Sequence, residues 1–171
     1  MRRTGRAARG RPAAESAVRE EVLHLLDDTF GRRNWGHTGL RAATRGLGVA
    51  EASWTPSGGV HSIWQQLNHI AHWRRHVRAR LLGRHPRTSQ AWPRGGTTAA
   101  ELRRTLAGLA ALHRQFRAAV LRLPPGALTE KRGSRYALAQ LLLAETAHVS
   151  YHTGQVLLMR RLYRHRRRMR S

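Results

Sequence analysis

Residues 138–162 read LAQLLLAETAHVSYHTGQVLLMRRL and contain no proline and a single glycine. Positions that recur every three or four residues share one face of a helix, and here one such face has apolar ends and a polar middle. Its members are Leu138, Leu141, Glu145, His148, His152, Gln155, Met159 and Leu162. Polar side chains on an inward face need partners, because burying them unsatisfied costs free energy. The stretch therefore predicts one long helix, about residues 136–164, whose inward face carries a polar site.

Apolar residues at helical spacing predict further helices along the rest of the chain. These segments cover about residues 14–30, 39–47, 60–82 and 98–123. Thr98 and Glu101 have the spacing of a capping box at the start of the last segment, and Pro124-Pro125-Gly126 ends it. No strand pattern or internal repeat competes with these helices, so we predict an all-α protein, an antiparallel four-helix bundle.

The length of 171 residues suits one domain with a substantial core. We expect this domain at residues 14–163, between a disordered basic tail at 1–13 and a basic C-terminal tail at 164–171. The first residues lack the apolar segment of a signal peptide, and no run approaches the ~20 apolar residues of a transmembrane helix. We therefore expect a soluble, cytoplasmic protein that does not enter a membrane.

The formal net charge is +23, from 32 basic and 9 acidic residues, and every basic residue except Lys131 is an arginine. Such a charge gives non-specific affinity for nucleic acid and other polyanions. The arginines are scattered along the chain and concentrated at both ends, which argues against one designed binding stripe. The codon usage of a GC-rich genome would also favour arginine over lysine. Binding of nucleic acid through the basic tails is therefore the alternative function.

His148 and His152 lie four residues apart on the predicted inward face, so their rings occupy adjacent turns. Imidazole nitrogens in this arrangement can converge on one metal ion at the ~2.0–2.1 Å typical of zinc. The chain has no cysteine, so a metal would have only nitrogen and oxygen ligands. The alternative is a buried network of polar side chains and water without a metal.

A third metal ligand should come from another helix of the bundle. In the segment 60–82, His69 falls at the edge of the apolar arc, whereas His72 falls further toward solvent. His69 is thus the favoured ligand and His72 its rival. His113 also points inward from the segment 98–123, where a hydrogen-bonded structural role is more common than metal ligation. The arc of the segment 60–82 consists of Ile63, Leu67, Ile70, Trp73, Val77 and Leu81.

Two segments of the sequence resemble signatures of the DinB/YfiT-like family. They are HVSYHTGQ at residues 148–155 and GVHSIWQQLNHIAHW at residues 59–73, and the resemblance extends over about residues 15–163. It implies a four-helix bundle of up-down-down-up connectivity, a homodimer, and one divalent metal ion held by His69, His148 and His152. The extra histidine at position 72 departs from the family pattern.

Three histidine ligands leave a coordination position open, as in catalytic metal sites. We expect zinc or nickel, with iron or manganese as further candidates. Relatives of this fold include transferases and isomerases that use low-molecular-weight thiols. The resemblance therefore suggests a metal-dependent transferase or hydrolase that acts on a small molecule. The other readings are a polyanion-binding protein and a scaffold with a structural or vestigial metal site.

Four polar residues receive provisional roles around this site. Glu145 either accepts a hydrogen bond from an imidazole or acts as a base, or it forms a salt bridge to an arginine. Gln155 either binds the substrate or orients His152. Arg74 and Arg160 are candidates for attracting an anionic substrate to the mouth of the site.

Overall fold

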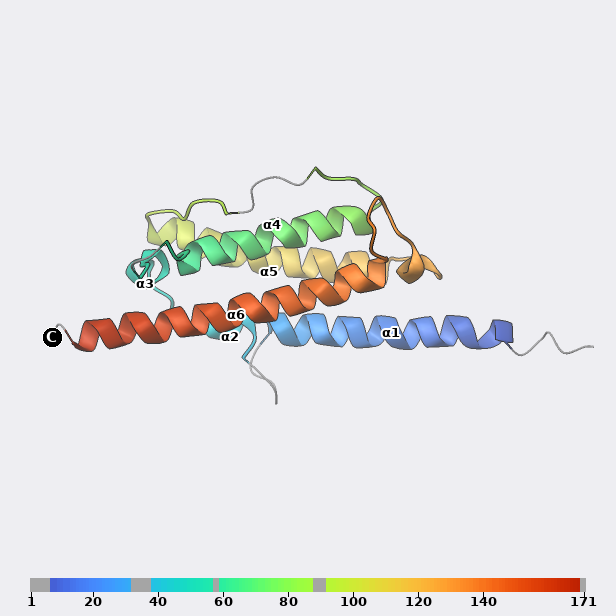
Figure 1. Cartoon of the computed structure of the whole chain (residues 1–171), viewed down its shortest axis with the longest axis horizontal. Coiled ribbons are helices and arrows are strands. Elements are labelled where there is room, and N and C mark those ends of the chain that lie inside the picture. Colours follow the sequence, from blue (N-terminus) through green and yellow to red (C-terminus); the bar gives the residue numbers. More distant parts are fainter. Residues whose placement is uncertain (1–6, 32–37, 57–58, 88–91, 170–171) are drawn as a thin grey trace, which may run out of the picture.

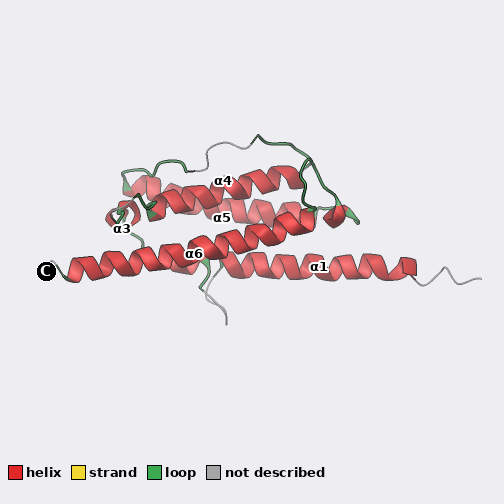
Figure 2. Cartoon of the chain, viewed as in Figure 1, coloured by secondary structure: helices red, strands yellow, loops and turns green. Residues whose placement is uncertain are grey.

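The computed structural model describes residues 7–31, 38–56, 59–87 and 92–169, with side chains from residue 14 onward. Within these ranges the protein consists of six α-helices and one 3-10 helix, with no β-strand. Figure 2 shows this architecture, which confirms the prediction of an all-α protein.

Four long helices make up most of the molecule. They are α1 (Ala7–Phe30), α4 (Ile63–Leu81), α5 (Ala99–Leu121) and α6 (Leu138–Arg168). In Figure 1, α4 and α5 lie side by side in one layer, and α1 and α6 lie side by side in the other. Because α4 also packs against α6, the inward face of α6 lies between the two layers.

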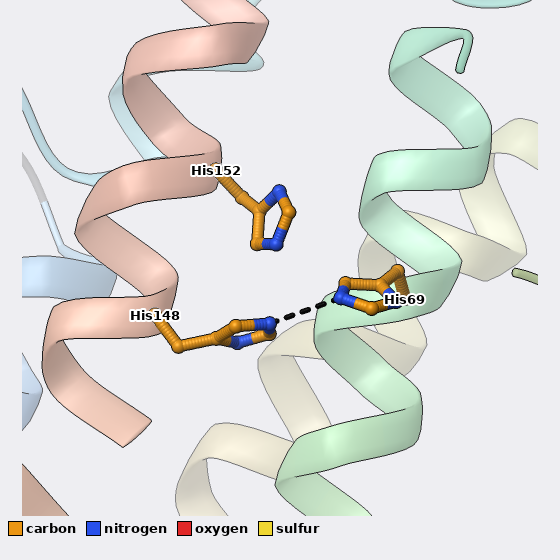
Figure 3. Close-up of side chains that lie close together, drawn as sticks. All are labelled: His69, His148 and His152. Atoms are coloured by element: carbon orange, nitrogen blue, oxygen red, sulfur yellow. Dashed lines mark hydrogen bonds between the residues drawn. The ribbon is translucent and has the colours of Figure 1, made fainter. Parts of the chain in front are cut away.

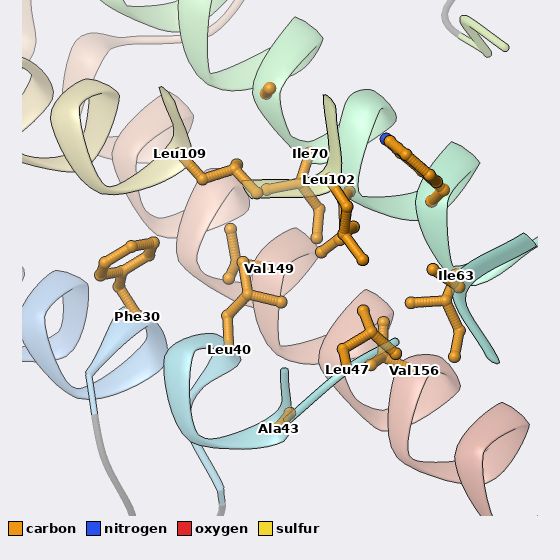
Figure 4. Packing of buried hydrophobic residues seen from close by; sticks show 14 of the residues in the cluster. Phe30, Leu40, Ala43, Leu47, Ile63, Ile70, Leu102, Leu109, Val149 and Val156 are labelled. Atoms are coloured by element: carbon orange, nitrogen blue, oxygen red, sulfur yellow. The ribbon is translucent and has the colours of Figure 1, made fainter. Parts of the chain in front are cut away.

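Apolar side chains fill the space between the layers in two clusters. Figure 4 shows the first, to which α1, α2, α4, α5 and α6 all contribute. The second includes Phe116 of α5, Val77 of α4 and Leu138 of α6. Each fully buried Leu or Phe stabilises the fold by roughly 1.5–3 kcal/mol. On α6, Glu145 and His148 lie between its contributions to the two clusters, and His152 lies among its contributions to the first.

The buried face of α6 differs in two ways from the predicted one. Leu142, Val149 and Val156 are fully buried although the predicted face omits them, whereas Leu162 is 42 % exposed. In the middle of α6, helices of both layers cover a wider arc of its surface than the predicted face, which explains the burial of these three residues. Toward its C-terminal end it extends past α3 (Val49–Ser53) into the surrounding solvent, as Figure 1 shows.

Arg160 ties the two short helices α2 (Leu40–Ala43) and α3 to α6. Its Nε and Nη2 donate to the carboxylate of Glu51 at 3.0 and 3.2 Å, and its Nη1 donates to the carbonyls of Ala43 and Arg45. The side chain is buried in these contacts. The prediction that Arg160 attracts a substrate at the site mouth is therefore wrong, because its guanidinium serves as a buried structural brace.

Helix ends follow local capping and composition. Ser62 and Gln65 form a capping box that starts α4 at Ile63, and the predicted box of Thr98 and Glu101 starts α5. At the N-terminus, residues 7–13 of the predicted tail are helical, despite Gly10 and Pro12, while residues 1–6 lie outside the described part. α6 likewise continues to Arg168, where basic side chains favour the negative end of the helix dipole.

No helix in the described part has the length and apolar character needed to cross a membrane.

Candidate metal centre

Three histidines from two helices meet between the layers. His69 comes from α4, and His148 and His152 come from adjacent turns of α6, as Figure 3 shows. One ring nitrogen of each lies within 4.8 Å of the others, and the Nε2 atoms of His148 and His69 are 3.0 Å apart. Two nitrogens bound to one tetrahedral ion at ~2.0–2.1 Å lie about 3.3 Å apart. The observed spacing is therefore close to what a shared metal ion requires.

Burial keeps His148 and His152 in the neutral form, which is the form of imidazole that binds a metal. Desolvation lowers the pKa of His148 to about 4, with further lowering by the positive charges of His152, His69 and Arg74. Desolvation also lowers the pKa of His152, partly opposed by its hydrogen bond to Gln155. Both rings are accordingly uncharged near neutral pH, and an unprotonated nitrogen is available to a metal.

Two glutamine side chains orient His152. The Nδ1 of His152 lies 2.6 Å from Oε1 of Gln66 and 2.7 Å from Oε1 of Gln155. Because both neighbours are hydrogen-bond acceptors, Nδ1 carries the proton and donates it. The lone pair is then on Nε2, the nitrogen that remains for a metal. This is the outer-shell arrangement that holds histidine ligands in other metal sites.

The ring of His69 is held by stacking against aromatic neighbours. Trp92 lies over it with ring centroids 3.8 Å apart and planes inclined by 9°. His61 stacks on Trp92 in turn, at 3.7 Å and 13°. Trp92 belongs to the loop before α5, so this loop contributes directly to the position of a histidine on α4.

Glu145 forms the salt bridge that was one of its predicted roles. Its two carboxylate oxygens accept from Nε and Nη2 of Arg74, at 2.6 and 3.0 Å, and both side chains are buried. Arg74 is fully buried, so the prediction that it attracts a substrate at the site mouth is wrong. A catalytic role for Glu145 stays a prediction, as it does for Gln155.

The remaining histidine candidates lie outside the cluster. Nδ1 of His113 is 3.3 Å from Nη1 of Arg74, and its Nε2 is 3.0 Å from Oδ1 of Asp27. His113 also stacks on Phe30, in keeping with a structural role. His72 contacts Trp73 edge-on and is not part of the cluster.

Sequence reasoning gave Gln66 no role and gave Arg74 the wrong one, although helical geometry offered a signal for both. At 100° per residue, Gln66 falls between Trp73 and Val77, inside the apolar arc of its helix. Arg74 falls inside the same arc, on its other side. A glutamine and an arginine within an apolar arc need buried partners, and these partners lie on α6. Trp92 carried no such signal, because a loop residue has no periodic position.

These features define a class of protein, an all-helical bundle with three histidines clustered between two of its helices. The sequence profile of the DinB superfamily matches residues 32–156. The chain therefore belongs to the DinB superfamily, which confirms the resemblance. Comparison with curated proteins and with solved structures found no match.

Proposed function

We propose that this protein binds one divalent metal ion through His69, His148 and His152. The observation that carries the proposal is the convergence of three imidazoles within 4.8 Å. The match to the DinB superfamily supports it. Uncharged nitrogen donors of this kind suit zinc or nickel, and iron or manganese would also be accepted.

We further propose that the site serves a transferase or hydrolase acting on a small molecule. Once bound, a metal with three protein ligands supplies a Lewis acid with an open position for water or for a thiol of low molecular weight. Gln66 and Gln155 keep His152 in the ligating tautomer. The amide NH2 of Gln155 can donate to a substrate, and Glu145 lies beside His148 as the candidate base, provided that it releases a hydrogen bond to Arg74.

Elemental analysis of the purified protein tests the metal proposal. We expect about one metal ion per chain in the wild type and a loss of most of it in His148→Ala and His152→Ala. His165→Ala is the matched control, because His165 is exposed on the same helix outside the cluster. Retention of metal in both cluster variants would overturn the proposal. A screen of thiol substrates with the metal-loaded protein then tests the activity.

We also propose an up-down-down-up connectivity for the bundle and a homodimeric assembly. In Figure 1, α1 and α6 run in one direction and α4 and α5 in the other, which supports the up-down-down-up connectivity. Exposed apolar residues follow one face of α6 and support a homodimer, which light scattering would detect. These residues are Leu143, Tyr151, Leu158 and Leu162.

Polyanion binding is the second candidate function. The end of α6 extends past α3 and exposes several arginines, among them Arg166, Arg167 and Arg168. If they bind nucleic acid, removal of residues 164–171 will reduce the affinity and its dependence on salt. An unchanged affinity would mean that this segment does not contribute, and that any binding of nucleic acid comes from the general charge of the protein.

A further inference from the structure

A cavity of about 280 Å³ lies beside the histidine cluster, between α4, α6 and the loop that precedes α6. Trp73, Val77 and Leu141 give it apolar walls. His148 also lines it, so the cavity adjoins the proposed metal site. A space of this size and character suits the body of a small organic molecule.

Arg80 supplies a fixed positive charge to this cavity. Its Nε donates to Nε2 of His76 at 3.2 Å, and its Nη1 donates to the carbonyls of Arg132 and Gly133. All of these acceptors are uncharged groups. Within the described ranges, no carboxylate pairs with Arg80, and its Nη2 has no hydrogen-bond partner. The guanidinium is therefore held in place with its charge uncompensated.

The other ionisable groups that line the cavity do not neutralise the charge of Arg80. Both oxygens of Glu145 are already bonded to Arg74. Burial lowers the pKa of His76, and the neighbouring charges of Arg80 and His72 lower it further, so His76 is neutral near neutral pH. Ser134 accepts a hydrogen bond from the backbone N–H of Tyr136, which leaves its hydroxyl proton to donate.

We infer that the cavity binds a small organic carboxylate, with the carboxylate at Arg80 and the apolar body between Trp73, Val77 and Leu141. A carboxylate fits better than a phosphate group, because only one terminal nitrogen of Arg80 remains to donate and a single charge is to be balanced. The inference rests on the proposed function in one respect: the end of the molecule away from Arg80 is the one that faces His148 and the metal.

Binding of benzoate to the metal-free protein tests this inference apart from the metal. Titration followed by the indole N–H signal of Trp73 in NMR should show saturable binding of benzoate. Benzamide has the same ring without the charge and should bind at least tenfold more weakly, the usual effect of losing a charge-assisted hydrogen bond. Equal binding of the two compounds would overturn the assignment of a carboxylate.

Two pairs of variants locate the binding. Arg80→Gln should weaken benzoate binding about tenfold or more, whereas Arg75→Gln removes an exposed charge from the same helix and should leave it unchanged. Similar weakening in both variants would assign the effect to general charge and overturn the inference. Ala144→Leu fills the cavity from an exposed position and should abolish binding even if Arg80→Gln perturbs the fold. Ala147→Leu, one turn nearer to His148 and outside the lining, is its control.

The outcomes keep the two proposals apart. Loss of benzoate binding in Ala144→Leu, with normal metal content, supports the cavity as the binding site for a carboxylate, whatever reaction the protein catalyses. Benzoate that binds only after metal is added, and equally well to Arg80→Gln, would be a metal ligand, which would overturn the inference. Absence of metal from the wild type would overturn the proposed function but would leave the benzoate measurement valid.

Discussion

Two groups of polar side chains lie between α4 and α6, and they differ in how they are satisfied. Arg74 and Glu145 form a buried ion pair in which the charges cancel and both carboxylate oxygens are used. His69, His148 and His152 form a cluster of three bases with no opposite charge among them. Nδ1 of His148 is also buried without a hydrogen-bond partner in the described part of the chain.

This difference separates a structural polar group from a candidate binding site. A closed ion pair has no use for a further ligand, and breaking it only exposes an uncompensated charge. The histidine cluster instead brings three potential ligand nitrogens within 4.8 Å of one another, and one cation can take a lone pair from each of them. Burial of polar residues alone therefore does not distinguish the two groups. They are distinguished by charge, because the ion pair is balanced and the three histidines have no acid among them.

The largest expected effect comes from breaking the ion pair. Arg74→Met should lower the free energy of unfolding by about 3–5 kcal/mol, because it leaves Glu145 buried without its partner. Urea unfolding of the metal-free protein measures this change. Arg74→Met combined with Glu145→Leu should recover most of the lost stability, since two apolar residues replace two charges. As a control, Arg117→Gln breaks a partly exposed pair with Asp27 and should cost less than about 1 kcal/mol.

Next in size is the effect of removing the groups that orient His152. Gln66→Leu and Gln155→Leu should each weaken metal binding roughly 10–100-fold, as loss of outer-shell partners does in other sites. Competition with a chelator measures the affinity. Gln140→Leu tests whether any glutamine on α6 has this effect, because Gln140 lies outside the cluster and its Oε1 accepts from the backbone N–H of Ala137 at the start of the helix. Equal affinities in all three variants would contradict the orienting role.

The most gradual effect should be the pH dependence of the metal-free protein. The pKa of His148 is about 4 in the folded protein, against 6.5 for an unperturbed histidine. As the pH falls below 6.5, the unfolded chain takes up the proton first, so the stability should fall until about pH 4 and this contribution should then level off. His148→Gln should show a shallower loss over the same range in urea unfolding. Identical slopes in the two proteins would contradict the lowered pKa.

The sequence alone determined the four long helices and one of their polar faces. Periodicity is a local property, so the apolar spacing and the capping residues at Thr98 and Glu101 predicted helices without knowledge of their neighbours. The same reasoning placed Glu145, His148, His152 and Gln155 on one inward face of the longest helix. The predicted ends of that face were less accurate, because the burial of Leu162 depends on how far the other helices extend.

Only the tertiary structure decided which polar residues pair across helices. Two inward residues meet when the rotation and axial shift of α4 and α6 bring them to the same height, and these are set by packing of the whole core. That packing put Arg74 against Glu145 and Gln66 against His152, whereas the sequence left the partner of Glu145 open and gave Gln66 no role. The packing also brought His69, and not His72, to the histidines of α6. The sequence favoured His69 only because it falls closer than His72 to the apolar arc of the predicted helix.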